Sequence, residues 1–170
     1  MYKRQNERYF IDEQLSRTDE VSVFKASQTA LARPVVLKIF EHNITAEDLD
    51  DFESEAQALG RLRHPNVVTL YDHGHLTDGR LFLVLEYIAG SRLDELLDLG
   101  PLPLETCLKV GLQVSSALTE SHRLGIVHRD VQPTNVILTD NEDGLTVRLI
   151  DFGIASVAER TEHELSLIHI

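Results

Sequence analysis

The segment VHRDVQPTN occupies positions 127–135, and the tripeptide DFG follows at positions 151–153. Together they set three oxygen-bearing side chains at fixed offsets: Asp130, then Asn135 five residues later, then Asp151 sixteen residues after that. A carboxylate can accept the proton of a hydroxyl group, and an amide and a second carboxylate can both ligate Mg²⁺. Phosphoryl transfer uses this combination of a base and metal ligands.

The residues between these motifs predict how Asn135 and Asp151 are brought together. Residues 136–138 and 145–150 are apolar and rich in β-branched side chains, and the polar stretch 141–144 separates them. This pattern predicts a hairpin, which would return the chain and deliver Asp151 next to Asn135.

The segments before residue 127 predict a long helix and a pair of strands. Residues 104–124 keep apolar side chains at helical spacing, and Gly125 follows as a candidate C-cap. Residues 67–71 and 81–86 predict two strands joined by a turn that contains Gly79.

Three more strands are predicted near the N-terminus, over residues 9–15, 21–26 and 34–40. The third is apolar except for Lys38. A central strand rarely carries a lysine unless the charge is paired, so a partner for Lys38 is expected. The alternative is a lysine that extends to solvent from an edge strand.

A helix is predicted to begin at Thr45, because an acidic residue three positions later completes a capping signature. Apolar residues then recur at steps of three and four as far as Leu62. Glu55 lies beside this apolar stripe and is the natural partner for Lys38. The alternative is an exposed helix glutamate without a specific role.

The order and spacing of these motifs resemble those of the protein kinase superfamily, over residues 9–164. The pattern H-R-D-x-x-x-x-N followed by D-F-G is similar to the kinase catalytic loop and metal-binding motif. Lys38 stands where V-A-I-K has its lysine, and Glu55 stands where the following kinase helix has its glutamate. Pro133 makes the chain look most like bacterial-type serine/threonine protein kinases.

The resemblance implies an α+β fold of the bilobal protein-kinase type. Residues 1–87 would form a small lobe of antiparallel strands with one regulatory helix, together with the start of the hinge. Residues 88–164 would form part of a mainly helical large lobe, with the catalytic loop, DFG and the start of the activation loop. A whole kinase domain is longer than this chain. The large lobe is therefore expected to be incomplete, and the fragment to be poorly soluble or inactive.

The activity implied by the resemblance is transfer of the ATP γ-phosphate to a serine or threonine hydroxyl of a protein, with Mg²⁺. By position, Asp130 would orient and deprotonate the substrate hydroxyl, while Asn135 and Asp151 would hold Mg²⁺. Lys38 would contact the α- and β-phosphates, with Glu55 orienting it.

The same likeness implies a set of nucleotide-contacting positions. Leu85 matches the gatekeeper, while the Glu86 carbonyl and the Ile88 N–H would bind adenine through the backbone. The full set comes from the first strands, the hinge and the strand after the catalytic loop: Ser16, Val23, Val36, Lys38, Leu85, Glu86, Ile88 and Ile137.

Two features depart from the family pattern. The three positions of the glycine-rich loop fall on Ser16, Thr18 and Val21, so close phosphate cradling is weakened and only the hydroxyls of Ser16 and Thr18 remain as side-chain donors. Gln132 stands where kinases carry a catalytic lysine that steadies the γ-phosphate. Loss of that charge would cost on the order of 10²-fold or more in rate. The base and the metal ligands are intact, which favours an enzyme.

Two other functions compete with this prediction. The altered loop and Gln132 are compatible with a nucleotide-binding pseudokinase or scaffold. A small-molecule kinase of the aminoglycoside phosphotransferase type is the third candidate. That family usually has H-G-D, so Arg129 and the turn at residues 64–66 favour the protein-kinase type.

Composition limits the partners. The net charge is −12 and the pI is about 5.0, which argues against a nucleic-acid partner or an anionic membrane surface. Cys107 is the single cysteine, so an intramolecular disulfide is impossible. No apolar run approaches the roughly 20 residues of a membrane span, and the N-terminus lacks a signal-peptide core. A cytoplasmic protein is expected; an anchor encoded after residue 170 would not be visible in this sequence.

The last six residues, 165–170, read LSLIHI. This peptide can be back-translated into the transposon end that serves as a sequencing-library adapter. We therefore expect residues 165–170 to be non-native, with a natural apolar tail as the alternative.

Overall fold

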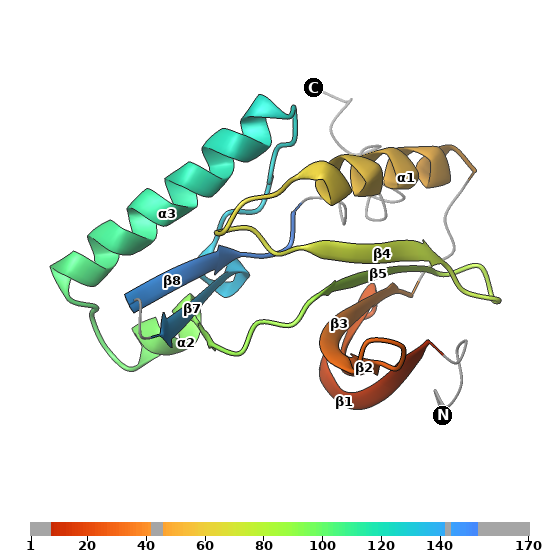
Figure 1. The fold of residues 1–170 in the computed structure, drawn as a ribbon, viewed down its shortest axis with the longest axis horizontal. Helices are drawn as coiled ribbons and strands as arrows, with labels where there is room; N and C mark the ends of the chain where they lie inside the picture. The colour runs from red at the N-terminus through yellow and green to blue at the C-terminus, as the bar shows by residue number, and fades with distance from the viewer. Residues whose placement is uncertain (1–7, 42–45, 142–143, 153–170) are drawn as a thin grey trace, which may run out of the picture. The chain divides into compact units, whose positions relative to one another are not determined.

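The computed structural model describes residues 8–41, 46–141 and 144–152 (Figure 1). Gly153, the predicted start of the activation loop and the tail at 165–170 lie outside these residues. The described chain forms two compact units. The first contains residues 8–56 and 70–87 apart from the gap at 42–45, and the second contains residues 57–69 and 88–152 apart from the gap at 142–143.

The first unit contains a five-stranded antiparallel sheet in the order β1-β2-β3-β5-β4. The strand predictions over residues 9–15, 21–26, 34–40 and 81–86 are confirmed. The observed strands are β1 (Tyr9–Arg17), β2 (Val21–Gln28), β3 (Arg33–Phe40), β4 (Leu70–His75) and β5 (Leu81–Glu86).

The two faces of this sheet differ because side chains alternate along each strand. One face is packed into a core that includes Phe24, Val35, Leu37 and Val84. Residues paired directly across antiparallel strands share a face. The pairs of Lys38 with Val23 and with Leu83 therefore put a row of three side chains on the opposite face. Lys25, Val36 and Leu85 form the next row on the same face.

Helix α1 (Ala46–Arg61) follows the third strand, close to the predicted span. Its predicted apolar stripe is buried: Phe52 is 1% exposed and Ala56 is fully buried. The Phe52 ring meets the edge of Phe40, with ring centroids 5.8 Å apart. This contact packs the helix onto the end of β3.

The second unit contains a three-stranded sheet in the order β6-β7-β8 and the long helix α3, which packs against β8 (Figure 1). The hairpin and the long helix predicted from the sequence are confirmed. Gly125 follows the last turn of α3 with φ +75° and donates its N–H to the His122 carbonyl at 2.9 Å, as expected after a helix C-terminus. The elements are β6 (Ser91–Arg92), α2 (Leu93–Asp98), α3 (Leu104–Arg123), the short 3₁₀ helix η1 (Pro133–Asn135), β7 (Val136–Asn141) and β8 (Gly144–Leu149).

The predicted strand 67–71 is wrong over its first three residues. Val67 forms an isolated parallel bridge with Leu149, and the Val68 N–H donates to the Leu149 carbonyl at 3.0 Å. Nearby, the buried Asn66 amide donates to the Gln113 Oε1 at 2.6 Å and to the Val147 carbonyl at 2.8 Å. These bonds hold the segment against β8 and α3, so β4 begins only at Leu70.

No helix in the described part of the chain is long and apolar enough to cross a membrane.

Candidate active site

His128 anchors the predicted catalytic loop from inside the second unit, where it is 1% exposed. The backbone N–H of Asp130 donates to His128 Nδ1 at 3.3 Å, so that nitrogen carries no proton. The proton of the neutral ring is then on Nε2, which lies 2.8 Å from the Ile150 carbonyl and donates to it. Burial lowers the pKa of His128, which favours this neutral form.

Phe152, the middle residue of DFG, packs on the same histidine. The two ring centroids are 4.5 Å apart, and Phe152 is 5% exposed. The loop that carries Asp130 and the segment that carries Asp151 therefore share one buried anchor.

Asp130 is exposed, and its carboxylate is held by two amides. Asn135 Nδ2 donates to Asp130 Oδ2 at 2.8 Å and to the Asp130 carbonyl at 3.0 Å. Gln132 Nε2 donates to the same Oδ2, also at 2.8 Å. Sequence reasoning missed the Gln132 bond, because it depends on a side-chain conformation that spacing does not determine.

Asn135 and Asp151 are brought together by the β7–β8 hairpin. The N–H of Ile150 donates to the Asn135 carbonyl at 2.9 Å, and Asp151 is the next residue. Because both bonds to Asp130 use Asn135 Nδ2, the Oδ1 atom is the one suited to a cation. An amide oxygen and a carboxylate are hard oxygen donors that fit Mg²⁺.

The described residues hold no group of three or more His, Cys, Asp or Glu side chains that could form a metal cage. Magnesium is usually bound through one or two protein groups, with phosphate oxygens and water completing the shell. The donors Asn135 and Asp151 match that type of site.

The backbone is strained at two residues of this centre. Arg129 has φ +66° and Asp151 has φ +58°, in the left-handed region that costs a non-glycine residue about 1–2 kcal/mol. Such strain persists only where surrounding contacts impose it. Here the anchor on His128 lies beside both residues, and the unusual backbone directs the chain as it enters Asp130 and leaves Ile150.

In the first unit, Lys38 is 9% exposed on β3, between Val23 and Leu83 in the same row. Glu55 is half-buried on α1, one turn after the buried Phe52. The ion pair between Lys38 and Glu55 stays a prediction.

The β1–β2 turn, where kinases have their glycine-rich loop, is closed by Thr18. Its Oγ1 accepts hydrogen bonds from the N–H groups of Glu20 at 3.2 Å and Val21 at 3.0 Å. It also donates to the Val21 carbonyl at 3.3 Å. The Thr18 hydroxyl is therefore engaged within the turn rather than available as the phosphate donor that the sequence predicted. Ser16 is exposed on β1 opposite Val23.

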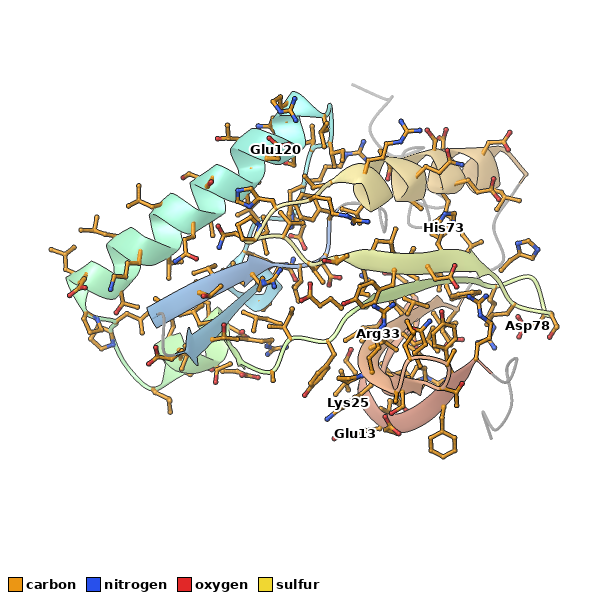
Figure 2. The ribbon with its side chains drawn as sticks, viewed as in Figure 1. Glu13, Lys25, Arg33, His73, Asp78 and Glu120 are labelled. Carbon is orange, nitrogen blue, oxygen red and sulfur yellow. The ribbon has the colours of Figure 1, made fainter. Side chains whose placement is uncertain are left out.

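The residues predicted to form the hinge begin where β5 ends. Glu86 pairs with Val35 of β3. The next residue, Tyr87, lies under the Lys25 ammonium, which is 4.5 Å from its ring centroid. Figure 2 labels Lys25. The sequence did not indicate this contact of Lys25 with Tyr87.

The remaining predicted positions, Ile88 and Ile137, belong to the second unit, and Ile137 pairs with Arg92 between β6 and β7. Gly90 was also missed. A Cβ at this position would lie 2.4 Å from the Leu138 carbonyl oxygen, so only glycine fits against β7.

Comparison with known proteins agrees with this geometry. The protein kinase domain family matches residues 9–168. The serine/threonine-protein kinase pkn3 of Myxococcus xanthus is 37% identical over 145 residues, which are 82% of this chain and 26% of that protein. The serine/threonine-protein kinase PknK of Mycobacterium tuberculosis is 37% identical over 148 residues, which are 86% of this chain and 13% of that protein. The chain thus spans about a quarter or less of these relatives.

The crystal structure of the Mycobacterium tuberculosis PknI kinase domain has a TM-score of 0.73 and 28% identity to this chain. The match covers 87% of this chain and 60% of that one. The fold prediction of a truncated protein kinase is confirmed. The chain belongs to the protein kinase domain family and is similar to its bacterial serine/threonine members.

Proposed function

We propose that the complete protein is a serine/threonine protein kinase, which transfers the γ-phosphate of ATP to a hydroxyl group of a protein substrate. The observation that carries the proposal is the arrangement around Asp130. Its carboxylate is hydrogen-bonded to Asn135 at 2.8 Å, and Asn135 is bonded in turn to the residue before Asp151. A base next to two oxygen donors for a cation is the arrangement that phosphoryl transfer needs.

In this proposal Asp130 accepts the proton of the attacking serine or threonine hydroxyl, whose oxygen forms the new bond to the γ-phosphorus. The bond between that phosphorus and the ADP oxygen breaks. Asn135 Oδ1 and the Asp151 carboxylate would hold the divalent cation, for which Mg²⁺ fits best. Its charge would neutralise the negative charge that develops on the phosphates.

The nucleotide contacts in this proposal are those that the likeness to protein kinases implies. Lys38 neutralises the α- and β-phosphates, and Glu55 orients it. A buried lysine among apolar neighbours supports this role, because a buried charge needs an opposite charge or an anionic ligand. Adenine is held by the Glu86 carbonyl, the Ile88 N–H and apolar contacts at Val23, Val36, Leu85 and Ile137, and Ser16 is the remaining assigned position.

The test is phosphate transfer from radiolabelled ATP by the full-length protein, with and without Mg²⁺. We expect Mg²⁺-dependent labelling of a protein substrate or of the kinase itself. Asp130→Asn should reduce labelling to a small residual rate, whereas Asp140→Asn, at an exposed position on β7, should leave it unchanged. Binding of ATP without any transfer by the wild-type protein would refute the enzyme and support a nucleotide-binding scaffold.

A further inference from the structure

Gln132 is bonded to the base rather than directed only at solvent. Its Nε2 lies 2.8 Å from Asp130 Oδ2, the oxygen that also accepts the bond from Asn135. The two donors reach one carboxylate oxygen from positions two and five residues later in the chain. They leave the second oxygen, Oδ1, outside both bonds.

The backbone that carries Gln132 is itself fixed. It is extended, with φ −146° and ψ 162°, and its carbonyl accepts the N–H of Asn135 at 3.0 Å. The next residue is Pro133, whose ring restricts the backbone further. The side chain therefore starts from a defined point beside Asp130, which lowers the entropy lost when its amide donates to the carboxylate.

We propose that Gln132 is a positioning residue for the base. Together with Asn135 it fixes the rotation of the Asp130 carboxylate, so that Oδ1 receives the proton of the substrate hydroxyl. This inference rests on the proposed function and assigns Gln132 a task different from the phosphate contact that its position implies. Asn135 is also a proposed cation ligand. Of these two donors to Asp130, Gln132 is therefore the one that can be replaced without altering the proposed cation ligands.

The chemistry of an amide makes the role specific. Gln132→Met keeps the length of the side chain and removes its donor, while Gln132→Glu replaces the donor by an acceptor that repels Asp130. A hydrogen bond to a charged group that is used in the transition state corresponds to about tenfold to a hundredfold in rate. We expect kcat of Gln132→Met to fall within that range, with KM for ATP changed less than about twofold. Gln132→Glu should fall further.

A double-mutant cycle in the full-length kinase separates this role from a phosphate contact. If Gln132 acts through Asp130, Gln132→Met should have no further effect on the residual rate in the Asp130→Asn background. Equal losses in both backgrounds, together with a raised KM for ATP, would overturn the proposal in favour of a direct phosphate contact. Gln57→Met, at an exposed position of α1, is the matched control and should leave kcat unchanged.

The hydrogen bond can also be tested without nucleotide. In a spectrum of side-chain amide groups, the Gln132 signal is identified by its absence in Gln132→Met. It should shift when Asp130 is replaced by asparagine, and the Gln57 signal should not. An unmoved Gln132 signal would overturn the proposal even in an active kinase. A shifted signal in a protein that transfers no phosphate would instead sink the proposed function and leave the bond standing.

Discussion

His128 Nε2 donates a hydrogen bond to the carbonyl of Ile150 at 2.8 Å, across 22 positions of sequence. Through its other nitrogen the same ring accepts the N–H of Asp130. One buried, neutral imidazole therefore ties the loop that carries Asp130 to the strand end that carries Asp151. Its protonation would remove the acceptor for the Asp130 N–H.

This arrangement makes the stability of the kinase domain depend on pH through His128. Burial lowers its pKa in the folded protein, so the unfolded chain takes up the proton first as the pH falls below about 6.5. The free energy of unfolding should therefore decrease from about pH 6.5 downwards and level off below the folded-state pKa. Urea unfolding at several pH values, compared between wild type and His128→Gln, checks this expectation.

The difference between those two proteins isolates the histidine from other titrating groups. Wild type and His128→Gln should converge as the pH falls. A constant gap between wild type and His128→Gln over the acidic range would contradict the assignment.

Gly90 gives a second prediction, on packing. A Cβ at this position would lie 2.4 Å from the Leu138 carbonyl oxygen and 2.8 Å from Ile137 Cγ2, so Gly90→Ala must displace β7. Overpacking of this kind costs about 1–3 kcal/mol, and the thermal unfolding midpoint should fall. Gly111→Ala is the opposite case, because the position is inside α3 and, apart from the adjacent residues and the backbone of α3 itself, nothing lies within 4 Å of the added methyl group. It should stabilise the protein by about 0.5–1 kcal/mol. Equal midpoints for the two variants would show that Gly90 does not approach β7 closely.

Features that depend on short-range spacing could be predicted from the sequence, whereas features that depend on long-range contacts could not. Asp130, Asn135 and Asp151 were recognisable because short-range spacing and one hairpin determine where they meet. The start of β4 was not, because Val67 pairs with Leu149, far away in sequence. Patterns of apolar residues give the type of an element, but its ends depend on partners that only the folded chain brings near.

Side-chain hydrogen bonds were the other class of feature that the sequence did not reveal. Gln132 was recognised as a departure from the family, and Thr18 as a missing glycine, yet neither substitution alone indicates which atom the new side chain binds. Rotamers and local backbone geometry decide that. Both residues are therefore better understood from their bonds than from the residues that they replace.

Thr18 leads to the third prediction. Its hydroxyl oxygen accepts hydrogen bonds from the N–H groups of Glu20 and Val21, which would otherwise be able to donate to a phosphate. Thr18→Val keeps the shape of the side chain and frees both donors, so the affinity for ATP should rise by up to about tenfold. Calorimetric titration of full-length Asp130→Asn with ATP and Mg²⁺ measures this without turnover. Thr77→Val, in the exposed turn between β4 and β5, should leave the affinity unchanged. A Thr18→Val affinity equal to that of the parent would show that these N–H groups do not reach the phosphates.

The last prediction concerns an apolar stripe on α3. Leu104, Leu108 and Leu112 recur every four residues along one side of the helix and are 74%, 59% and 72% exposed. Exposed apolar stripes drive association, so the 170-residue chain prepared alone should form oligomers or precipitate. Replacing all three leucines by glutamine should raise the monomer fraction in size-exclusion chromatography with light scattering. Leu99→Gln, at a position that is 86% exposed but outside the stripe, should leave association unchanged. A wild-type 170-residue chain that is monomeric at high concentration and unfolds cooperatively would show that the exposed leucines of α3 do not cause association.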